Sequence, residues 1–374
     1  MKITIVAGFL LPVPPVRGGA MEKTWHRLAL LFAAAGHEVT FVSRRWPGWP
    51  DQEIVDGVRH LRVRGADHTR HLALNLLLDL IWGLRVTRVL PAADVVITNT
   101  VALPVWLRRI KPSAGRVVAV MARMPKGQTR FYGRVDLLLS LSAAVSARIV
   151  AENPRLAGRI MPFPLPVDCQ ILAGPSRRTA TLTIGYIGRL NPEKGLALLL
   201  AAAVRLAARS DLPPWRLVLQ GPLDIPAGGG GAAWFAALSA RYAAALGERL
   251  VLLAPEYDSA LLARSYAAID VFCYPSLAEH GETFGVAVAE AMAAQCAPVV
   301  SGLACFRELV TDGETGLVFD HSGPSPEIAL ERTLALLLSD SMLRTAIADR
   351  ARSHVRRFDY PVVAADLLAR LRPS

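Results

Sequence analysis

Two glutamates, eight positions apart, stand where a polar loop passes into a helical pattern. Glu282 lies in the loop after the apolar stretch Asp270–Tyr274, and Glu290 lies about two turns into the helical pattern that follows. An ionised carboxylate only accepts hydrogen bonds, so both glutamates suit a ligand rich in hydroxyls, such as a ribose or another sugar. The N–H groups at 283–285 add donors at the start of this helix, and Gly285 lets a ligand come close. Such a pair alone is weak evidence for a binding site, because charged residues on the solvent-exposed face of a helix often have this spacing.

A second group of residues could bind phosphate. In the stretch Gly185–Gly195 a predicted strand ends at Gly188, and a helix begins near Gly195. Arg189 and Lys194 flank the turn between them, and together with helix N–H groups they could hold a diphosphate. The alternative is an exposed loop with two solvated cations.

The third candidate is the loop 12–20, which joins the first strand to the first helix. Gly18 and Gly19 would let the backbone approach a ligand at a helix N-terminus, and Arg17 and Glu22 flank them. A merely flexible connection is the other interpretation.

These residues are separated by short apolar runs that alternate with helical patterns, which is typical of βαβ units and parallel sheets. The expected strands of the first half are Lys2–Ala7, Glu38–Ser43, Val58–Val63, Asp94–Asn99, Arg116–Met121 and Val135–Ser140. Those of the second half are Thr181–Gly188, Trp215–Gln220, Arg249–Leu253, Asp270–Tyr274 and Ala297–Ser301. The expected helices are Met21–Ala35, Val101–Ile110, Gly195–Arg209, Gly231–Leu246, Ser259–Ala267, Phe284–Ala294 and Pro361–Leu371. The pattern predicts two doubly wound α/β domains, whose ligands bind beyond the carboxyl ends of the strands.

The proline-rich stretch Met161–Asp168 reads as a linker, which sets the domains at 1–165 and 166–358. The chain has 374 residues, of which 52% are hydrophobic and 20% charged, so each domain can bury a core and wholesale disorder is excluded.

Four cysteines without C-x-x-C spacing argue against a thiolate zinc site and favour a reducing cytosol. We therefore expect a cytoplasmic protein, with peripheral association at the inner face of the membrane as the alternative.

The three groups of residues, in this order, resemble retaining family-4 glycosyltransferases of the GT-B fold, over nearly the whole chain. The resemblance is carried by Gly18-Gly19, AAAGHEVTFVS (33–43), PVD (166–168), Gly188-Arg189 with Lys194-Gly195, the Glu282-x7-Glu290 block and ELVTDGETGLVFD (308–320). It implies two facing Rossmann-like domains with a cleft between them. The first domain would bind the acceptor and the second the nucleotide-sugar. The final helix, 359–374, would pack back on the first domain.

The resemblance also implies roles for single residues. Glu290 would hold the ribose, and Glu282 the transferred sugar. The predicted catalytic residues are Arg189, Lys194 and Glu282, and the predicted donor-binding residues are Gly19, Gly188, Arg189, Lys194, Glu282, Thr283, Phe284, Gly285 and Glu290. No metal and no cofactor are expected, and the sequence leaves a UDP- or GDP-type donor open.

One position departs from the family. Where the family often carries a histidine after the strand Arg116–Met121, this chain has Ala122 and Arg123. Arg17, Arg123 and Lys126 are weak candidates for binding an anionic acceptor. His280 could substitute for the missing imidazole, although a surface role is the more ordinary interpretation.

Positive charge is concentrated in the first domain. The net charge of the whole chain is +11, and residues 166–374 contain slightly more acidic than basic residues. This asymmetry favours an anionic acceptor or a membrane surface as partner, or else reflects only a basic proteome. No nucleic-acid-binding pattern is found. The stretch His71–Leu90 is too polar to be a membrane span, and it predicts a core-facing helix in preference to a helix lying on a membrane.

Other functions remain open at this point. The dinucleotide fingerprint G-x-G-x-x-G and the Walker pattern are both absent from the sequence. A nucleotide-sugar epimerase, a phosphorylase-like GT-B enzyme and a non-catalytic nucleotide- or glycan-binding module are the alternatives to a glycosyltransferase.

Overall fold

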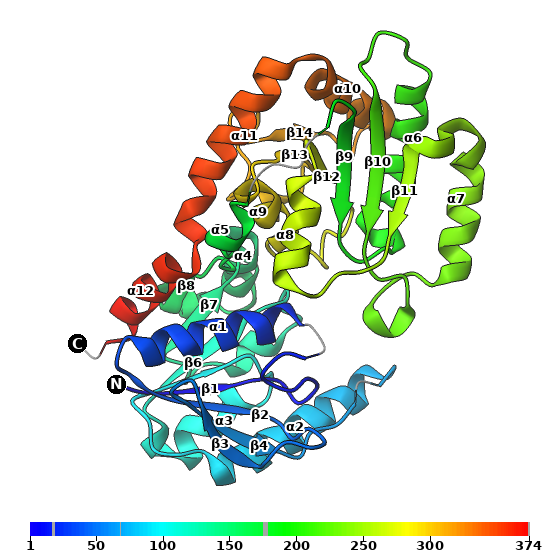
Figure 1. Cartoon of the computed structure of the whole chain (residues 1–374). Helices are drawn as coiled ribbons and strands as arrows, with labels where there is room; N and C mark the ends of the chain where they lie inside the picture. Colours follow the sequence, from blue (N-terminus) through cyan, green and yellow to red (C-terminus); the bar gives the residue numbers. More distant parts are fainter. Residues whose placement is uncertain (17–18, 68, 175–178, 373–374) are drawn as a thin grey trace. The chain divides into compact units, whose positions relative to one another are not determined.

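The computed structural model describes residues 1–16, 19–67, 69–174 and 179–372 (Figure 1). The chain divides into two compact units. Unit 1 comprises Met1–Pro166 and Tyr360–Ser374, and unit 2 comprises Val167–Asp359. Unit 1 is therefore discontinuous in sequence, because the last helix returns to it.

Unit 1 contains an eight-stranded sheet in the order β3-β4-β2-β1-β5-β6-β7-β8. Its strands are β1 (Lys2–Val6), β2 (Glu38–Arg44), β3 (Gln52–Val55), β4 (Val58–Val63), β5 (Val95–Thr98), β6 (Arg116–Met121), β7 (Leu137–Ser140) and β8 (Ile160–Pro162). The central strands β1 and β5 are parallel, with Ile3 opposite Val95. They are buried almost throughout, which explains their continuous runs of Ile and Val.

One edge of this sheet differs from the prediction of parallel strands. Strand β3 was not predicted, and it pairs antiparallel with β4. Asp56 and Gly57 join the two strands, and both have positive φ, 49° and 78°. These values are those of a type I′ turn, for which Asp-Gly is a typical sequence. The signal was therefore present in the sequence, although β3 itself is half exposed and only weakly apolar.

The helices of unit 1 are α1 (Ala20–Ala34), α2 (Leu72–Val89), α3 (Leu103–Ile110), α4 (Ala143–Glu152) and α12 (Tyr360–Leu371). Helix α12 packs against α1, both of them in this unit (Figure 1). Helix α1 buries Trp25, Leu28 and Phe32, and the Trp25 ring stacks on Phe163 with ring centroids 5.3 Å apart. These contacts form the core on one face of the sheet.

Unit 2 contains a six-stranded parallel sheet in the order β11-β10-β9-β12-β13-β14. Its strands are β9 (Leu182–Ile187), β10 (Trp215–Gln220), β11 (Leu250–Leu253), β12 (Val271–Tyr274), β13 (Ala297–Ser301) and β14 (Leu317–Phe319). Its helices are α5 (Cys169–Leu172), α6 (Leu196–Ala207), α7 (Ala232–Leu246), α8 (Ser259–Ala267), α9 (Val286–Ala293), α10 (Pro326–Ser339) and α11 (Ser341–Val355). Strands β9 and β12 are neighbours although two strands lie between them in sequence, so the direction of chain progression reverses here. Such a switch point is where doubly wound sheets bind ligands.

Helix α2 combines features of both interpretations of His71–Leu90. One face packs against α3 and β4, as a core-facing helix should. Its leucines, however, lie largely on the exposed side. None of the described helices is long and apolar enough to span a membrane.

Candidate functional site

Two loops meet at the switch point of the sheet in unit 2. The loop after β9 carries Arg189 and Lys194, and the loop after β12 carries Glu282 and leads into α9. They are in close contact, because the Leu277 N–H donates to the Glu193 carbonyl at 2.9 Å. Gly195 has φ +71°, and a Cβ built on it would lie 2.0 Å from the Pro275 carbonyl oxygen. A glycine is thus required here for the two loops to pack together.

Lys194 and Glu282 form a buried ion pair at this contact. Lys194 Nζ lies 2.6 Å from Glu282 Oε2, and the two side chains are only 4% and 11% exposed. The sequence predicted that both residues hold the donor, but at different parts of it, and it did not predict that they bind each other. A buried ion pair of this kind is strongly destabilised when one partner is lost.

Tyr274 completes the surroundings of this pair. The ammonium group of Lys194 lies 5.6 Å from the centroid of the Tyr274 ring, which itself stacks on Tyr186. Burial raises the pKa of the Tyr274 hydroxyl, and the negative charge of Glu282 raises it further. Tyr274 thus remains neutral and a hydrogen-bond donor. We did not predict a role for either tyrosine, because in sequence they look like ordinary strand residues.

Arg189 lies across the neighbouring glycine loop. Its guanidinium donates to Glu193 Oε1 at 3.1 Å and to the Gly228 carbonyl at 3.4 Å. The buried Tyr186 hydroxyl donates to the Arg189 carbonyl at 2.9 Å. The side chain of Arg189 is 45% exposed, so it can exchange its present partners for a ligand.

The four glycines 228–231 hold that loop in place rather than leaving it open. Their N–H groups donate to the carbonyls of Ile225, Asp224, Leu190 and Leu223, in that order along the chain. A Cβ on Gly229 would lie 2.2 Å from the Leu223 backbone. The loop is thus tied to the turn that carries Arg189, through the bond from the Gly230 N–H to the Leu190 carbonyl.

Glu290 is oriented by a tyrosine from another helix. The Tyr266 hydroxyl, on α8, donates to Glu290 Oε2 at 2.8 Å. Tyr266 is completely buried, and burial raises the pKa of its hydroxyl well above the usual value. No local sequence signal could have indicated Tyr266, because 24 positions separate it from its partner.

The start of α9 is rigid. Gly285 has φ +90°, and a Cβ there would lie 2.6 Å from the Phe306 ring. The Phe284 side chain is buried edge-on against Phe358, so only its backbone can face a ligand. Thr283 is half-buried beside it, and a Cβ on Gly188 would lie 2.9 Å from the Tyr186 hydroxyl. These positions shape the backbone of the site, and their role in donor binding stays a prediction.

Two buried oxygens near the same edge have no hydrogen-bond partner among the described residues. They are Oδ1 of Asn191 and Oε1 of Gln220, at or just beyond the ends of β9 and β10. Their amide nitrogens are engaged, with the carbonyls of Gly228 and Ala254. Buried polar atoms are rarely left unpaired, so these acceptors mark a place where a ligand or water can donate.

The carboxyl edge of the sheet in unit 1 holds the remaining candidates. Gly19 precedes α1 with φ +90°, and a Cβ on it would lie 2.3 Å from Glu22 Oε2. Burial raises the pKa of Glu22, an effect that the positive charge of Arg123 opposes. Arg123 and Lys126 are both exposed, and Arg17 lies outside the described residues. The structure thus brings Gly19, Glu22 and Arg123 together in unit 1.

His280 and Asn99 also bear on the site. His280 is exposed in the loop after β12, next to the exposed Glu279. In unit 1 the buried Oδ1 of Asn99, directly after β5, finds no hydrogen-bond partner among the described residues. β5 is the neighbour of β1 at the switch point of that sheet, so Asn99 is a candidate that we missed.

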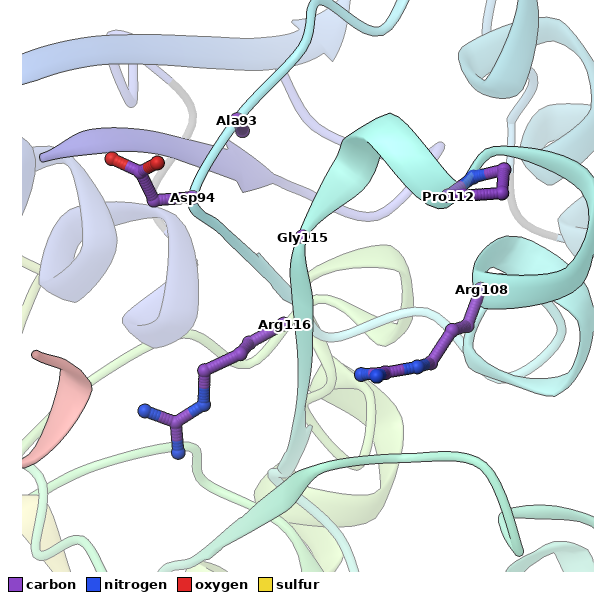
Figure 2. Close-up of a pocket in the computed structure, with 6 residues that line it drawn as sticks. All are labelled: Ala93, Asp94, Arg108, Pro112, Gly115 and Arg116. Carbon is purple, nitrogen blue, oxygen red and sulfur yellow. The ribbon is translucent and has the colours of Figure 1, made fainter. Parts of the chain in front are cut away.

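A hollow of about 430 Å³ in unit 1 lies elsewhere (Figure 2). It is formed at the amino ends of β5 and β6, where Asp94 and Arg116 lie, opposite to the edge at which such sheets bind ligands. Its arginines already have partners: Arg108 pairs with Asp136, and Arg116 donates to the Leu371 carbonyl at 3.2 Å. This hollow is therefore not a candidate active site.

One known protein family matches most of unit 2. Residues 174–354 match the family described as glycosyl transferases group 1. The chain is 33% identical over 205 residues to a phosphatidyl-myo-inositol mannosyltransferase of Mycolicibacterium smegmatis, covering 54% of this chain and 47% of the relative. It is 31% identical over 189 residues to a D-inositol 3-phosphate glycosyltransferase of Corynebacterium glutamicum, covering 50% of this chain and 42% of the relative. The chain thus spans less than half the length of these relatives.

Solved structures match over the whole chain. Sucrose-phosphate synthase from Thermosynechococcus elongatus superimposes with a TM-score of 0.79, at 20% identity and 98% coverage of both chains. The Anabaena protein HepE, solved with UDP and glucose, gives a TM-score of 0.73 at 17% identity, with 99% of both chains covered. These likenesses confirm the predicted fold, two Rossmann-like α/β domains of the GT-B class.

Proposed function

We propose that the protein transfers a sugar from a nucleoside-diphosphate donor to a hydroxyl of an acceptor, in keeping with the match of residues 174–354 to the glycosyl transferases group 1 family. The observation that carries this proposal is the Lys194–Glu282 pair at the switch point of unit 2, with Arg189 and Glu290 on the adjoining elements. Cations for a diphosphate and carboxylates for sugar hydroxyls are the groups that such a donor requires.

We assign the roles as follows. Lys194 and Arg189 bind the diphosphate, and they stabilise the charge that develops on it as it leaves. Glu290, held by Tyr266, accepts hydrogen bonds from the ribose. Glu282 and the backbone at 283–285 bind the transferred sugar. Phosphate and hydroxyl groups of the ligand would then lie beside the Lys194–Glu282 pair. Lys194 has further N–H groups to donate to the phosphate, and Glu282 can accept further hydrogen bonds from the hydroxyls.

The reaction breaks the bond between the anomeric carbon and the diphosphate oxygen, and forms a bond from that carbon to the acceptor oxygen. The acceptor proton passes to an oxygen of the departing diphosphate. Attack from the face that the leaving group vacates retains the configuration. Positively charged side chains and helix N–H groups carry the developing negative charge, so we propose that the transfer needs no metal.

We propose an acceptor that bears phosphate. The names of the two relatives contain phosphatidyl-myo-inositol and inositol 3-phosphate, both of which are anionic. In unit 1 the exposed Arg123 and Lys126 suit such an acceptor. All four cysteines are free, which fits a reducing cytoplasm, where nucleotide-sugars are made.

The test has two stages. A panel of UDP- and GDP-sugars is screened by thermal shift, because a ligand that binds only the native state raises the melting temperature. The donor so found is then incubated with and without candidate acceptors, and nucleotide release is measured with and without EDTA. Release of nucleotide only with an acceptor, unchanged by EDTA, supports the proposal. Conversion of the donor without an acceptor points to an epimerase, release driven by inorganic phosphate points to a phosphorylase, and binding without turnover to a non-catalytic module.

A further inference from the structure

Helix α2 carries a broad apolar face on its outer side. Its exposed large apolar residues are Leu72, Leu74, Leu76, Leu77, Leu80, Leu84 and Val89, with exposed fractions between 38% and 68%. Leu80 lies three residues after Leu77 and four after Leu76, and Leu84 lies four residues further on, so these leucines form a continuous stripe. Figure 1 shows α2 extending beyond the neighbouring strands of unit 1. Contiguous apolar surface of this kind marks an interaction site.

The helix cannot rotate about its axis to bury these leucines, because polar contacts fix its inner face. Asp79 Oδ2 accepts from the N–H groups of Val101 and Ala102, at 3.1 and 2.7 Å, just before α3. On the same face the Trp82 indole N–H donates to the Ala7 carbonyl at 3.1 Å. Gly83 lies against Trp106, where a Cβ would come within 2.8 Å of the ring. The usual arrangement is inverted: an aspartate faces inward and the leucines face outward.

Positive charge surrounds the apolar face. Arg64 and Arg70 precede the helix and are exposed, and Arg85 and Arg88 lie in its last two turns. Asp79, the one acidic residue of α2, is buried. The exposed surface of this helix therefore carries leucines and cations without a carboxylate.

A small hollow adjoins the helix. It measures about 190 Å³ and is lined by Arg64 and Arg85 together with apolar side chains that include Phe9 and Leu78. The Arg85 guanidinium donates to the Arg64 carbonyl at 2.8 Å, which holds the two residues side by side. A hollow with apolar walls and two cations suits a phosphate group attached to an apolar chain.

We propose that the exposed face of α2 docks unit 1 on a membrane surface that contains anionic phospholipid. The leucines enter the boundary between headgroups and acyl chains, while Arg64, Arg70 and Arg88 lie among the headgroup phosphates. The helix lies along the surface, in keeping with its inability to span a membrane. Charge complementarity selects this occupant, because a second copy of the chain would bring cation against cation. The proposal is independent of the donor site in unit 2.

The test is co-sedimentation of the full chain with vesicles of phosphatidylcholine, with or without phosphatidylglycerol. We expect binding to the anionic vesicles that weakens as salt rises, since surface charges are screened. The triple variant Leu76→Ser, Leu80→Ser, Leu84→Ser should lower the vesicle partition coefficient by about tenfold or more, from the apolar area that is lost. Arg64→Gln with Arg88→Gln should lower it on anionic vesicles only.

The matched control is Leu336→Ser, Met342→Ser, Val362→Ser, which removes three exposed apolar residues from other helices. It should bind vesicles as the unchanged chain does. The melting temperature reports whether the fold is intact, and its shift on addition of the nucleotide-sugar reports whether the donor site is intact. Neither should change in any variant. Equal vesicle binding by both triple variants, or a dimer in sedimentation velocity that only the α2 variant dissociates, would overturn the proposal.

Discussion

The carboxyl edges of the two sheets handle their polar side chains differently. In unit 2 the ionic and hydroxyl groups at this edge are bound to one another: Lys194 to Glu282, Tyr266 to Glu290, and Arg189 to Glu193. In unit 1 the exposed cations Arg123 and Lys126 stand at this edge. Unit 2 is thus preorganised for a polar ligand, as the proposed donor site requires.

Unit 1 also places polar groups in its interior and apolar groups outside. His60, on β4, is fully buried, and neither of its ring nitrogens has a hydrogen-bond partner among the described residues. The leucines of α2, a helix that packs on the same strand, are exposed. The contrast lies in how the charged and titratable groups are paired: Lys194 and Glu282 of unit 2 bind each other, whereas His60 of unit 1 has no hydrogen-bond partner among the described residues.

The largest effect is expected at the buried ion pair of unit 2. Lys194→Met leaves Glu282 buried without its partner, which should lower the free energy of unfolding by about 3–5 kcal/mol. The double variant with Glu282→Gln should recover most of that stability, but not turnover. Lys2→Met, at an ion pair in which both side chains are largely exposed, is the control and should change stability by less than about 1 kcal/mol. Urea unfolding measures all three, and a small loss for Lys194→Met would remove the contrast between the units.

His60 gives unit 1 a sensitivity to acid. Burial lowers the pKa of His60 to about 4, assisted by the positive charges of Arg62 and His26. The unfolded chain binds a proton near pH 6.5 and the folded chain does not, so the stability is complete above pH 6.5 and falls as the pH drops towards 4. The loss should reach about 2 kcal/mol at pH 5.

His60→Leu should flatten that dependence, measured as melting temperature against pH. Replacing the exposed His280 by Ala should leave the slope as it was. The same slope in His60→Leu as in the unchanged chain would mean that other groups cause the acid sensitivity.

Arg189 should matter for turnover and little for stability. Arg189→Gln removes a charge-assisted contact to the diphosphate, so kcat/KM should fall about tenfold. Arg205→Gln, on the exposed side of α6, serves as the control. Unchanged kinetics in Arg189→Gln would withdraw the diphosphate role.

The smallest effect is expected at Tyr266. Tyr266→Phe removes the hydrogen bond to Glu290 and keeps the ring, so donor affinity should fall by a few-fold, since such a bond contributes about 0.5–1.5 kcal/mol. Calorimetry of donor binding measures it, with Tyr242→Phe as the control. Affinity for the free base, without ribose, should not change; an equal loss there would indicate damage to the fold instead of a role at the ribose.

The sequence was most informative where a signal is local. Runs of Val and Ile predicted the central strands, and Lys194, Glu282 and Glu290 were identified from their types and from their positions after strands. What could not be predicted depends on pairing across the sheet. That Lys194 meets Glu282 follows from the adjacency of β9 and β12, and Tyr266 meets Glu290 through packing between helices.

For α2, the hydrophobic pattern indicated an amphipathic helix but not which side faces inward. That side is decided by the two N–H groups that Asp79 binds and by the Ala7 carbonyl that Trp82 reaches. A leucine-rich helix is ordinarily expected to bury its leucines, and here a polar anchor overrides that preference.

The path of the chain between the units has a consequence for biosynthesis. Residues 167–359 run without interruption through unit 2, and its two ends are joined where the Val167 N–H donates to the Phe358 carbonyl at 2.9 Å. Unit 2 can therefore fold as soon as this stretch leaves the ribosome. Unit 1 is synthesised first, but one side of α1 stays uncovered until α12 emerges, so this unit completes its folding later. During that interval the nascent chain exposes apolar surface that a chaperone would be expected to shield.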